Sequence, residues 1–443
     1  MPEFDSAYRV LRRRGEPDLR SLQSYRQQGG YSALERALHD QTPEQVIQLV
    51  SEARLRGRGG AGRLTAEKWR IVRRQQESPK YVICNAYDAD PRSWAARSLL
   101  ERNPHQVIEG ILLAAYAVGA TEAYLMTRSL FREGIEAVQQ ALNEALEAGL
   151  VGRSILGTTF HCTINVVGFD IGFIGGEETV QIAVIKGRRG MPEQRPPYPA
   201  IYGLWDKPTA INSLETLANV PLIVRDGPEA FRRLGSETTP GTKVLTIYDA
   251  VPDAEPRVVE VPFGTSLREI LRHAGLSHPD SELRAVVVGG AEGGALPVNL
   301  LDLPFDFDPL EEAGAIVGSG VIELLPAQTC MVAWAMERTR YLSNESCGKC
   351  VPCRIGVKRM TGVLEGIISD LGVRSDLDLL DELAGYVPDG SLCGFGIQAP
   401  NAYKTARRYW PEHFQMHIEE QQCPTGTCVP VRSHRFVTKH VLP

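Results

Sequence analysis

The chain has 443 residues, of which 43% are hydrophobic and 23% are charged. This composition excludes a disordered, collagen-like or coiled-coil protein and leaves room for about two to four domains. The 48 Lys and Arg residues against 54 Asp and Glu residues give a net charge of −6, and no basic run of the kind that binds nucleic acid stands out, so no nucleic-acid partner is expected.

The N-terminus reads as neither a signal peptide nor a transit peptide, and no membrane span is expected. The longest apolar stretch, residues 107–120, contains Glu109 and is too short to cross a membrane, so we predict a buried helix there. We therefore expect a cytoplasmic protein, which partner subunits could hold at the inner face of a membrane.

The first 238 residues are predicted to form an N-terminal arm, residues 1–45, followed by an α/β domain over residues 46–238. Short apolar strands alternate with segments of helical periodicity in this domain. The strands are predicted at residues 80–84 and 122–127, and the helices at residues 104–120 and 133–148. This strand-then-helix order is typical of an α/β layer.

The second half of the chain changes character twice. Residues 239–325 contain strand-like segments at 243–248 and 258–261 and a short helix at 267–274, which resembles a β-grasp module. Residues 326–420 have helical periodicity and are predicted to form a helical bundle, and residues 421–443 form a tail.

Nine cysteines in a chain without a secretion signal favour metal ligation over disulfides. Cys347, Cys350 and Cys353 form a C-x2-C-x2-C motif, and Cys393 follows in a Ser-Leu-Cys-Gly segment. Three closely spaced thiolates and a distant fourth are the ligand set of a [4Fe–4S] cluster. A structural zinc is the alternative, but this spacing is uncommon for zinc. Cys84 and Cys162 are expected to be buried small hydrophobes.

A second group of ligands involves the tail. Cys423 and Cys428 form a C-x4-C pair, His417 lies just before them, and Cys330 precedes the cluster motif. Together they would make a closed Cys₃His zinc site, with His413 as a competing ligand. A second iron–sulfur site, a site shared with a partner, and four unligated residues stay open as alternatives.

Residues 56–62, Arg-Gly-Arg-Gly-Gly-Ala-Gly, form a glycine-rich loop that precedes a segment containing Lys68. Closely spaced glycines allow positive φ angles and expose backbone N–H groups to an anion, to which Lys68 could add a charge. On its own this signal is weak, because many glycine turns bind nothing and Lys68 could be a solvated surface residue.

Several motifs stand in a fixed order along the chain and together resemble a known family. They are the glycine loop, Asn85-Ala86 after a strand, Gly176-Glu177-Glu178-Thr179, residues 207–219 with their Lys-Pro-Thr-Ala-Ile-Asn start, residues 345–356 around the cysteine motif, and Ser391-Leu392-Cys393. The chain is similar to the NADH-oxidising flavoprotein subunit of respiratory complex I and to the diaphorase subunits of NAD-linked hydrogenases and formate dehydrogenases. The resemblance covers about residues 46 to 420.

This resemblance implies an FMN- and NAD-binding α/β domain, a β-grasp module and a helical domain with a [4Fe–4S] cluster. NADH or NADPH would deliver a hydride to FMN, which would pass single electrons to the cluster. Partners would be other iron–sulfur subunits, including a small [2Fe–2S] subunit and a larger subunit. The proposed zinc ligands resemble a feature of the electron-bifurcating hydrogenase branch.

The resemblance also assigns roles to single residues. Gly57, Gly59, Gly60 and Lys68 would hold the FMN phosphate. Asn85, Asn212 and Asn219 would hydrogen-bond the flavin, and Asp88 counts among the cofactor-binding residues. Glu177 and Glu178 would face the nicotinamide nucleotide. For the two glutamates, the alternative is an exposed start of a helix, where acids are favoured by the helix dipole.

The chain departs from the family pattern around the flavin. The family's Asn-Ala-Asp-Glu-x-Glu-Pro-Gly is Asn85-Ala86-Tyr87-Asp88-Ala89-Asp90-Pro91-Arg92, and its Tyr-x-Cys-Gly-Glu-Glu-Thr is residues 173–179 with Gly175 in place of the cysteine. Arg63 and Lys186 are further changes towards basic residues. Either the pocket binds FMN and prefers another nucleotide, or the chain is a degenerate relative that acts as an iron–sulfur relay or scaffold. Enzyme activity is therefore uncertain from the sequence.

Overall fold

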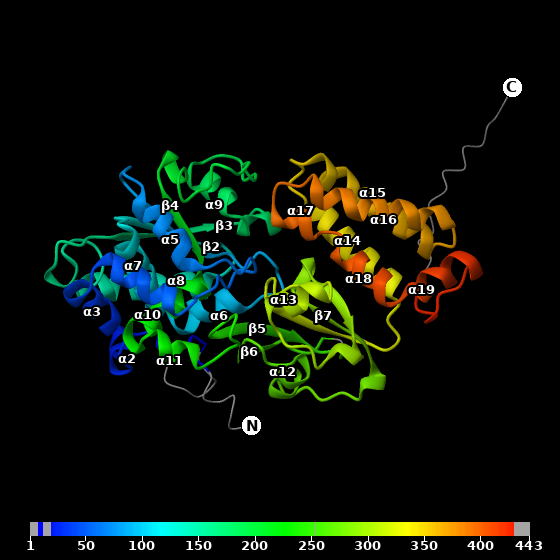
Figure 1. Cartoon of the computed structure of the whole chain (residues 1–443), viewed down its shortest axis with the longest axis horizontal. Coiled ribbons are helices and arrows are strands. Elements are labelled where there is room, and N and C mark those ends of the chain that lie inside the picture. Colours follow the sequence, from blue (N-terminus) through cyan, green and yellow to red (C-terminus); the bar gives the residue numbers. More distant parts are fainter. Residues whose placement is uncertain (1–7, 12–18, 252, 429–443) are drawn as a thin grey trace. The chain divides into compact units, whose positions relative to one another are not determined.

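The computed structural model describes residues 8–11, 19–251 and 253–428. The chain divides into two compact units, residues 1–325 and residues 326–443 (Figure 1). Parts of the predicted arm (residues 1–7 and 12–18) and most of the predicted tail (residues 429–443) lie outside the described residues.

A four-stranded parallel sheet in the order β3-β2-β1-β4 forms the first half of unit 1. Its strands are β1 (Tyr81–Ala86), β2 (Glu122–Arg128), β3 (Thr163–Phe169) and β4 (Thr209–Ser213). The predicted strands at 80–84 and 122–127 are confirmed as β1 and β2. The predicted helices are confirmed as α7 (Pro104–Val118) and α8 (Arg132–Glu147).

The two faces of this sheet have separate hydrophobic cores, because successive strand side chains point to opposite faces. Val82, Cys84 and Ala86 of β1 pack with helix α7, nearly all of whose residues are buried. Ile83 and Tyr87 belong to the other core, which includes Ile182 of helix α9 (Glu178–Ile185). Cys84 and Cys162 are fully buried, as the sequence predicts.

The other helices of this half of unit 1 surround the sheet. They are α2 (Leu22–Gln27), α3 (Ser32–Asp40), α4 (Pro43–Glu52), α5 (Thr65–Arg74), α6 (Ala95–Arg102), α10 (Leu214–Asp226) and α11 (Pro228–Arg232). Helix α4 begins with a capping box in which Thr42 and Gln45 satisfy each other's backbone N–H groups. Helix α7 ends at Gly119, whose φ of 82° is the left-handed C-cap that glycine adopts most easily.

A mixed five-stranded sheet in the order β6-β5-β9-β7-β8 forms the second half of unit 1. Its elements are β5 (Thr242–Tyr248), β6 (Arg257–Pro262), α12 (Leu267–His273), β7 (Leu283–Val288), β8 (Gly294–Pro297), α13 (Phe307–Glu312) and β9 (Val321–Pro326). Antiparallel pairing of β5 with β6, and parallel pairing of β5 with β9, give the β-grasp-like module predicted from the sequence.

Buried ionic contacts join the two halves of unit 1. Lys243 on β5 lies 2.5 Å from the carboxylate of Glu215 on α10, and both side chains are almost completely buried. Glu260 on β6 accepts hydrogen bonds from the N–H groups of Arg9, Val10 and Leu11, which fastens this part of the arm to the module. Such pairing offsets the cost of burying these charges.

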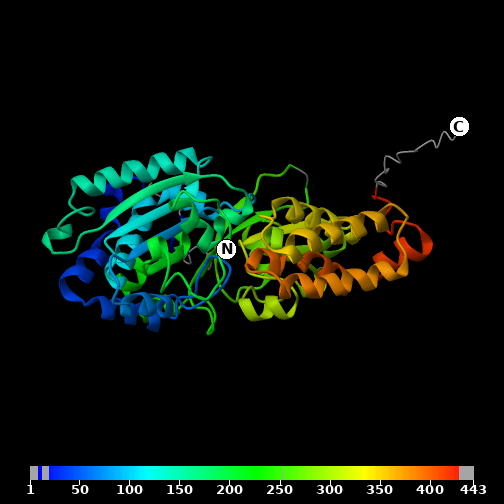
Figure 2. The same ribbon diagram turned by 90° about the horizontal axis from the view of Figure 1, so that it is seen from above.

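Unit 2 is the predicted helical bundle, and Figure 2 shows its helices running roughly alongside one another. Its elements are α14 (Met331–Glu345), the π-helical turn η7 (Pro352–Val357), α15 (Lys358–Ile368), α16 (Arg374–Asp389), α17 (Gly394–Gln398), α18 (Asn401–Tyr409), α19 (Pro411–Gln415) and the π-helical turn η8 (Met416–Glu420). Both π-turns lie at cysteine or histidine residues that the sequence marks as ligands, which agrees with the frequent location of π-bulges at functional sites.

No helix among the described residues is long and apolar enough to cross a membrane.

Candidate functional site

The carboxyl ends of β1 and β4 bring together most of the residues predicted to bind the cofactor. These strands pair in parallel, with Cys84 opposite Asn212 and Asn85 opposite Ser213. Ligands of α/β sheets bind at this edge, outside the carboxyl ends of the strands. The glycine loop reaches the same edge, since a Cβ atom built at Gly59 would lie 3.3 Å from Cβ of Ser213.

A buried arginine supports the glycine loop through hydrogen bonds. Arg58 is only 2% exposed, and its guanidinium donates hydrogen bonds to the carbonyl oxygens of Arg56, Pro240 and Thr242. Burial lowers the pKa of Arg58 to about 10, although neighbouring carboxylates favour its charged form. The backbone N–H group of Arg58 also donates a hydrogen bond to the hydroxyl oxygen of Thr216 on α10 at 2.8 Å. The loop is therefore a fixed structure, with Gly59 and Ala61 exposed.

Lys68 lies between the glycine loop and the glutamate pair. Its Nζ is 2.5 Å from Glu178 and donates to the carbonyl oxygen of Ile211 on β4 at 2.6 Å. Only 26% of its side chain is exposed, so Lys68 is half-buried and ion-paired and is not a freely solvated lysine. The structure places a positive charge at the strand ends, where a phosphate would need one.

Glu177 and Glu178 begin helix α9, as the helix-start alternative predicts, but they are not both exposed there. The carboxylate of Glu177 accepts hydrogen bonds from the N–H groups of Thr179 and Val180, so Glu177 is the N-cap of the helix, and 11% of its side chain is exposed. Arg195 lies 3.3 Å from Glu177 and 3.6 Å from Glu178. Two cations and two carboxylates thus form one ionic network beside the glycine loop.

The two strand-end asparagines are fixed by different partners. The amide nitrogen of Asn85 donates to the carbonyl oxygen of Gly176 at 2.8 Å, which ties β1 to the segment before the glutamates. The side-chain oxygen of Asn212 accepts a hydrogen bond from the Trp69 indole at 2.9 Å. Both asparagines therefore lie at the site with defined orientations.

Asp88 and Asn219 have partners within the protein. The Asp88 carboxylate accepts hydrogen bonds from Ser93 and from the N–H group of Ala96 at 2.8 Å, at the start of α6. Burial raises its pKa to about 6. Asn219 has no exposed surface, and its amide donates to the Glu215 carbonyl within α10. Both residues thus have structural partners, and their part in binding a cofactor stays a prediction.

The departures from the family pattern fit their surroundings. The guanidinium of Arg92 pairs with Glu323 on β9 at 2.6 Å and lies over the ring of Tyr248, so it points to the β-grasp-like module. Lys186 pairs with Asp206 at 3.0 Å. Arg63 is exposed, as its simplest interpretation predicts. The guanidinium of Arg92 thus has both an ionic and an aromatic partner in the β-grasp-like module.

The residues at this edge fit an FMN phosphate. Besides the Gly59 contact, a Cβ atom at Gly60 would lie 3.0 Å from the Gly318 carbonyl oxygen, and Gly60 has a φ of 103°. Glycine is therefore needed for the loop to lie this close to β4 and the β-grasp-like module while its outer side stays exposed. An exposed glycine loop next to a lysine is the arrangement that binds phosphate groups.

The four cysteines of the predicted cluster lie together in unit 2. Cys353 is buried, and burial raises its pKa, with Cys347 and Cys350 close enough to add to this effect. The N–H group of Leu392, next to Cys393, lies 3.5 Å from Sγ of Cys350. A Cβ atom at Gly396 would lie 3.3 Å from Cβ of Cys353. The distant fourth cysteine thus joins the loop of three, as a cubane cluster requires.

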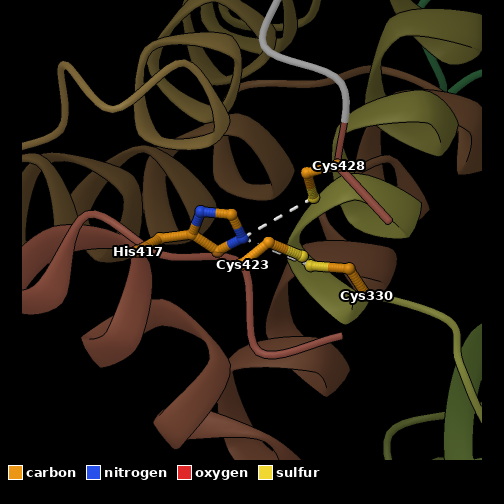
Figure 3. A group of neighbouring side chains, drawn as sticks. All are labelled: Cys330, His417, Cys423 and Cys428. Atoms are coloured by element: carbon orange, nitrogen blue, oxygen red, sulfur yellow. Dashed lines mark hydrogen bonds between the residues drawn. The ribbon is translucent and has the colours of Figure 1, made fainter. Parts of the chain in front are cut away.

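The second ligand group also assembles in unit 2 (Figure 3). The ligand atoms of Cys330, His417, Cys423 and Cys428 all lie within 4.8 Å of one another. Nε2 of His417 is 3.4 Å from Sγ of Cys330 and 3.6 Å from Sγ of Cys428. Nδ1 of the competing His413 instead accepts a hydrogen bond from the Met331 N–H group. The geometry therefore selects His417.

Two of the three thiols in this group are poised to ionise. Hydrogen bonds from Cys428 and from the two histidines lower the pKa of Cys330, while the same contact with Cys330 raises the pKa of Cys428, so these two thiols share one proton when no metal is bound. Burial opposes ionisation of Cys423, but hydrogen bonds from Thr425 and nearby backbone groups outweigh it and lower its pKa to about 7. Thiolates are the form that binds zinc. The set of three sulfurs and one nitrogen fits a closed tetrahedral site.

Arg195 and Arg58 contribute to the site at the carboxyl ends of β1 and β4, but they do not appear among the residues predicted from the sequence. Arg195 precedes a Pro-Pro pair in an irregular segment, and nothing in the sequence distinguishes it from the other basic residues that follow the two glutamates. Arg58 lies inside the glycine loop, and a charged residue in a loop usually indicates exposure. Its complete burial depends on carbonyl oxygens from distant parts of unit 1.

Comparisons with known proteins agree with these two sites. Residues 50–222 match the family model described as the Nuo51 FMN-binding domain. Residues 333–417 match the model described as the NADH-ubiquinone oxidoreductase-F iron-sulfur binding region. The first region holds the glycine loop and the glutamate pair, and the second holds the four cysteines of the predicted cluster.

Two curated relatives match nearly the whole chain. The NADH-quinone oxidoreductase F subunit 2 of Rhizobium meliloti (strain 1021) is 38% identical over 416 residues, which are 94% of this chain and 98% of that protein. The NADP-reducing hydrogenase subunit HndC of Solidesulfovibrio fructosivorans is 36% identical over 418 residues, which are 94% of this chain and 84% of that protein.

A solved structure shows the same fold. The crystal structure of an NAD+-reducing [NiFe]-hydrogenase in the H2-reduced state superposes with a TM-score of 0.79 at 30% sequence identity. The match covers 89% of this chain and 66% of the hydrogenase chain. The chain therefore spans just under two thirds of the hydrogenase chain that it matches.

Proposed function

Because the chain belongs to the family of the F subunits of NADH-quinone oxidoreductases, which includes hydrogenase subunits, we propose that it is an electron-transfer subunit of a multi-subunit redox complex. It would oxidise NADH or NADPH at FMN in unit 1 and carry electrons through a [4Fe–4S] cluster in unit 2. The observation that carries this proposal is the convergence of the glycine loop, Lys68 and the glutamate pair at the carboxyl ends of β1 and β4.

Bound FMN would supply the conversion between a two-electron hydride and single electrons, which an iron–sulfur cluster accepts one at a time. The glycine loop and Lys68 would bind the flavin phosphate. Asn212, oriented by Trp69, would donate its amide group to the flavin. Glu177 and Glu178, oriented by Arg195, would bind the nicotinamide nucleotide.

In unit 2, Cys347, Cys350, Cys353 and Cys393 would hold the cluster. The Leu392 N–H group aimed at Cys350 would stabilise negative charge on that sulfur, which is one way in which proteins set a cluster's reduction potential. Partner subunits would accept the electrons, and we propose a small [2Fe–2S] subunit and a larger iron–sulfur subunit. Association with them would place the chain at the cytoplasmic face of a membrane.

The test is the flavin and iron content of the anaerobically purified protein within its complex. About one FMN and about four irons per chain are expected if both sites are loaded. NADH or NADPH should then reduce ferricyanide through the purified protein. About four irons without flavin would overturn the proposed oxidation of nucleotides and leave the relay or scaffold function.

We also propose that Cys330, His417, Cys423 and Cys428 bind a structural zinc ion. A closed Cys₃His site would fasten the last described residues, through Cys423 and Cys428, to the start of α14, where Cys330 lies. Binding of such an ion adds directly to folding stability.

Elemental analysis tests this second proposal. The purified protein should contain about one zinc per chain in addition to the iron, and the variants Cys423→Ser and Cys428→Ser should lose the zinc and keep the iron. Cys162→Ser is the control, because Cys162 is a buried cysteine of unit 1. Full iron loss together with the zinc, or zinc retained in both variants, would contradict the assignment.

A further inference from the structure

Tyr87 occupies the position after Asn85-Ala86 and is completely buried. Its ring stacks on Phe169 at the end of β3, with centroids 4.5 Å apart and an angle of 28° between the rings. The Arg128 guanidinium lies 4.8 Å from the ring centroid on the end of β2. Tyr87 therefore packs across the carboxyl ends of three neighbouring strands and does not project from the protein.

The hydroxyl of Tyr87 fixes the segment that leads to the glutamate pair. It donates a hydrogen bond to the Gly172 carbonyl oxygen and accepts one from the Ile171 N–H group, each at 3.0 Å. Residues 173–176 then form a single 3₁₀ turn, and Glu177 follows directly. One side chain thus holds two backbone groups of the segment that leads into the turn before the glutamates.

Gly175 is the position that makes room for this ring. A Cβ atom built there would overlap carbon atoms of the Tyr87 ring, so no other residue fits while the ring keeps its place. Its carbonyl oxygen accepts a hydrogen bond from Gln181 of α9 at 3.1 Å. The ring of Tyr87 and the missing side chain of Gly175 are therefore complementary in shape.

In the family pattern that the sequence resembles, these two positions are an aspartate and a cysteine, and they are 88 residues apart in this chain. A short side chain directly after β1 leaves room for a cysteine on the turn, whereas a tyrosine at this position requires glycine there. Each change alone would leave a cavity or an overlap, and both together fill the space. Tyr87 and Gly175 are thus a coupled pair of substitutions relative to the family pattern.

We propose that Tyr87 is a positioning residue which, matched with Gly175, holds residues 171–178 so that Glu177 and Glu178 stand beside Lys68 and Arg195. The nucleotide-binding part of this inference rests on the proposed oxidation of NADH or NADPH. The positioning part does not, because it concerns contacts within unit 1. Tyr87 acts through the segment and is not itself a catalytic residue.

Hydrogen exchange of the full-length protein tests the positioning directly. Tyr87→Phe keeps the ring and removes both hydroxyl hydrogen bonds, so amide exchange in residues 171–180 should speed up about 3- to 10-fold, the effect of one or two lost hydrogen bonds. Tyr124→Phe is the matched control on the same face of the sheet, since its hydroxyl binds Glu122 and not this segment. Unchanged exchange in Tyr87→Phe would overturn the proposal.

A double-mutant cycle tests whether Tyr87 and Gly175 are matched to each other. Gly175→Cys should lower the melting temperature and speed exchange in residues 171–180, because the added side chain overlaps the ring. Tyr87→Asp together with Gly175→Cys should be less impaired than Gly175→Cys alone. Strictly additive defects would mean that the two positions are not matched. If Gly175→Cys does not fold, the Tyr87→Phe result still decides the positioning.

Steady-state kinetics with ferricyanide test the link to the nucleotide. Tyr87→Phe should raise the KM for NADH or NADPH about 3- to 10-fold and change kcat less than about twofold, with the FMN content unchanged. An unchanged KM would overturn the link. If the wild-type protein holds no FMN and oxidises neither nucleotide, the proposed function fails and the exchange experiment still decides whether Tyr87 positions the segment.

Discussion

The cluster region of unit 2 and the nucleotide edge of unit 1 have kept their family residues to different degrees. All four cysteines of the cluster are present at the expected spacing, and the structure brings them together. At the nucleotide edge, the glycine loop and Lys68 remain, but Tyr87, Arg92, Gly175 and Lys186 replace family residues. Each of these replacements has a defined partner or a complementary space in the structure.

This difference follows from the bonds that each site needs. A cluster is held by covalent iron–sulfur bonds, so a missing cysteine cannot be replaced by a change elsewhere. A nucleotide site is held by hydrogen bonds, shape and charge, which a second change can restore. Departures from a pattern at such a site therefore show loss of function only if the structure leaves them unpaired.

The largest effect is expected at the cluster. Cys350→Ala should abolish the low-temperature EPR signal of the reduced protein and most of its roughly four irons, because three thiolates do not complete the ligand set. Cys84→Ala, in a buried cysteine of unit 1, should leave the signal intact and serves as the control. An unchanged signal in Cys350→Ala would refute the assignment of the cluster.

The next largest effect is expected at Arg58, which supports the glycine loop. Arg58→Met would leave three buried carbonyl oxygens without their donor and should lower the free energy of unfolding by about 2–4 kcal/mol. Chemical denaturation measures this change, and FMN affinity should fall with it because the loop loses its support. Arg63→Met, an exposed residue of the same region, should change neither quantity appreciably.

A moderate effect of pH is expected from Asp88. Burial raises its pKa to about 6 from an ordinary value of 3.8, so the folded protein binds this proton more tightly than the unfolded chain. Its stabilising contribution is therefore complete below about pH 4 and is lost as the pH rises to about 6, by about 1–3 kcal/mol.

Asp88→Asn should make the decrease between pH 4 and 6 smaller, while Asp170→Asn, at an exposed position, should retain it in full. Wild type and both variants should share a further decrease from about pH 4.5 to 8, because burial and the nearby Asp90 raise the pKa of Glu292 from 4.5 to about 8. An equal decrease from pH 4 to 6 in wild type and Asp88→Asn would show that another group titrates there.

The smallest effect is expected at Lys186, although the sequence marks it as a change of charge. Its partner Asp206 is largely exposed, and such pairs contribute little to stability. Lys186→Ala should shift the melting temperature by about 1 °C or less and leave the preference between NADH and NADPH unchanged. A reversal of that preference would mean that Lys186 contacts the nucleotide.

The sequence predicts the elements and ligands that depend on local patterns. The strands β1 and β2, the helix α7 and the C-x2-C-x2-C motif are all visible as periodicity or spacing. The Cys₃His group is predicted as well, and the structure settles the choice between His413 and His417 because the Nδ1 of His413 already binds a backbone N–H group.

What the sequence does not predict depends on contacts between distant segments. Arg92 looks like an obstruction until the structure shows Glu323 on β9 as its partner. Tyr87 looks like damage to a flavin site until Gly175 is seen beneath its ring. Asn219 belongs to a family motif, yet it is completely buried and its amide donates a hydrogen bond to the Glu215 carbonyl oxygen. In these three cases the role of the residue depends on its contacts with residues far away in the sequence. The residue type at a single position does not reveal such contacts.

An anaerobic titration of the purified complex with NADH and, separately, NADPH tests most directly whether electrons pass from the nucleotide through FMN to the [4Fe–4S] cluster. We predict that at least one nucleotide bleaches the flavin absorbance and produces the EPR signal of the reduced cluster, and that Lys68→Met weakens both responses in parallel. Two results would contradict this electron path. One is a protein that contains iron and sulfur but no flavin, and the other is a cluster that stays oxidised with either nucleotide while dithionite reduces it.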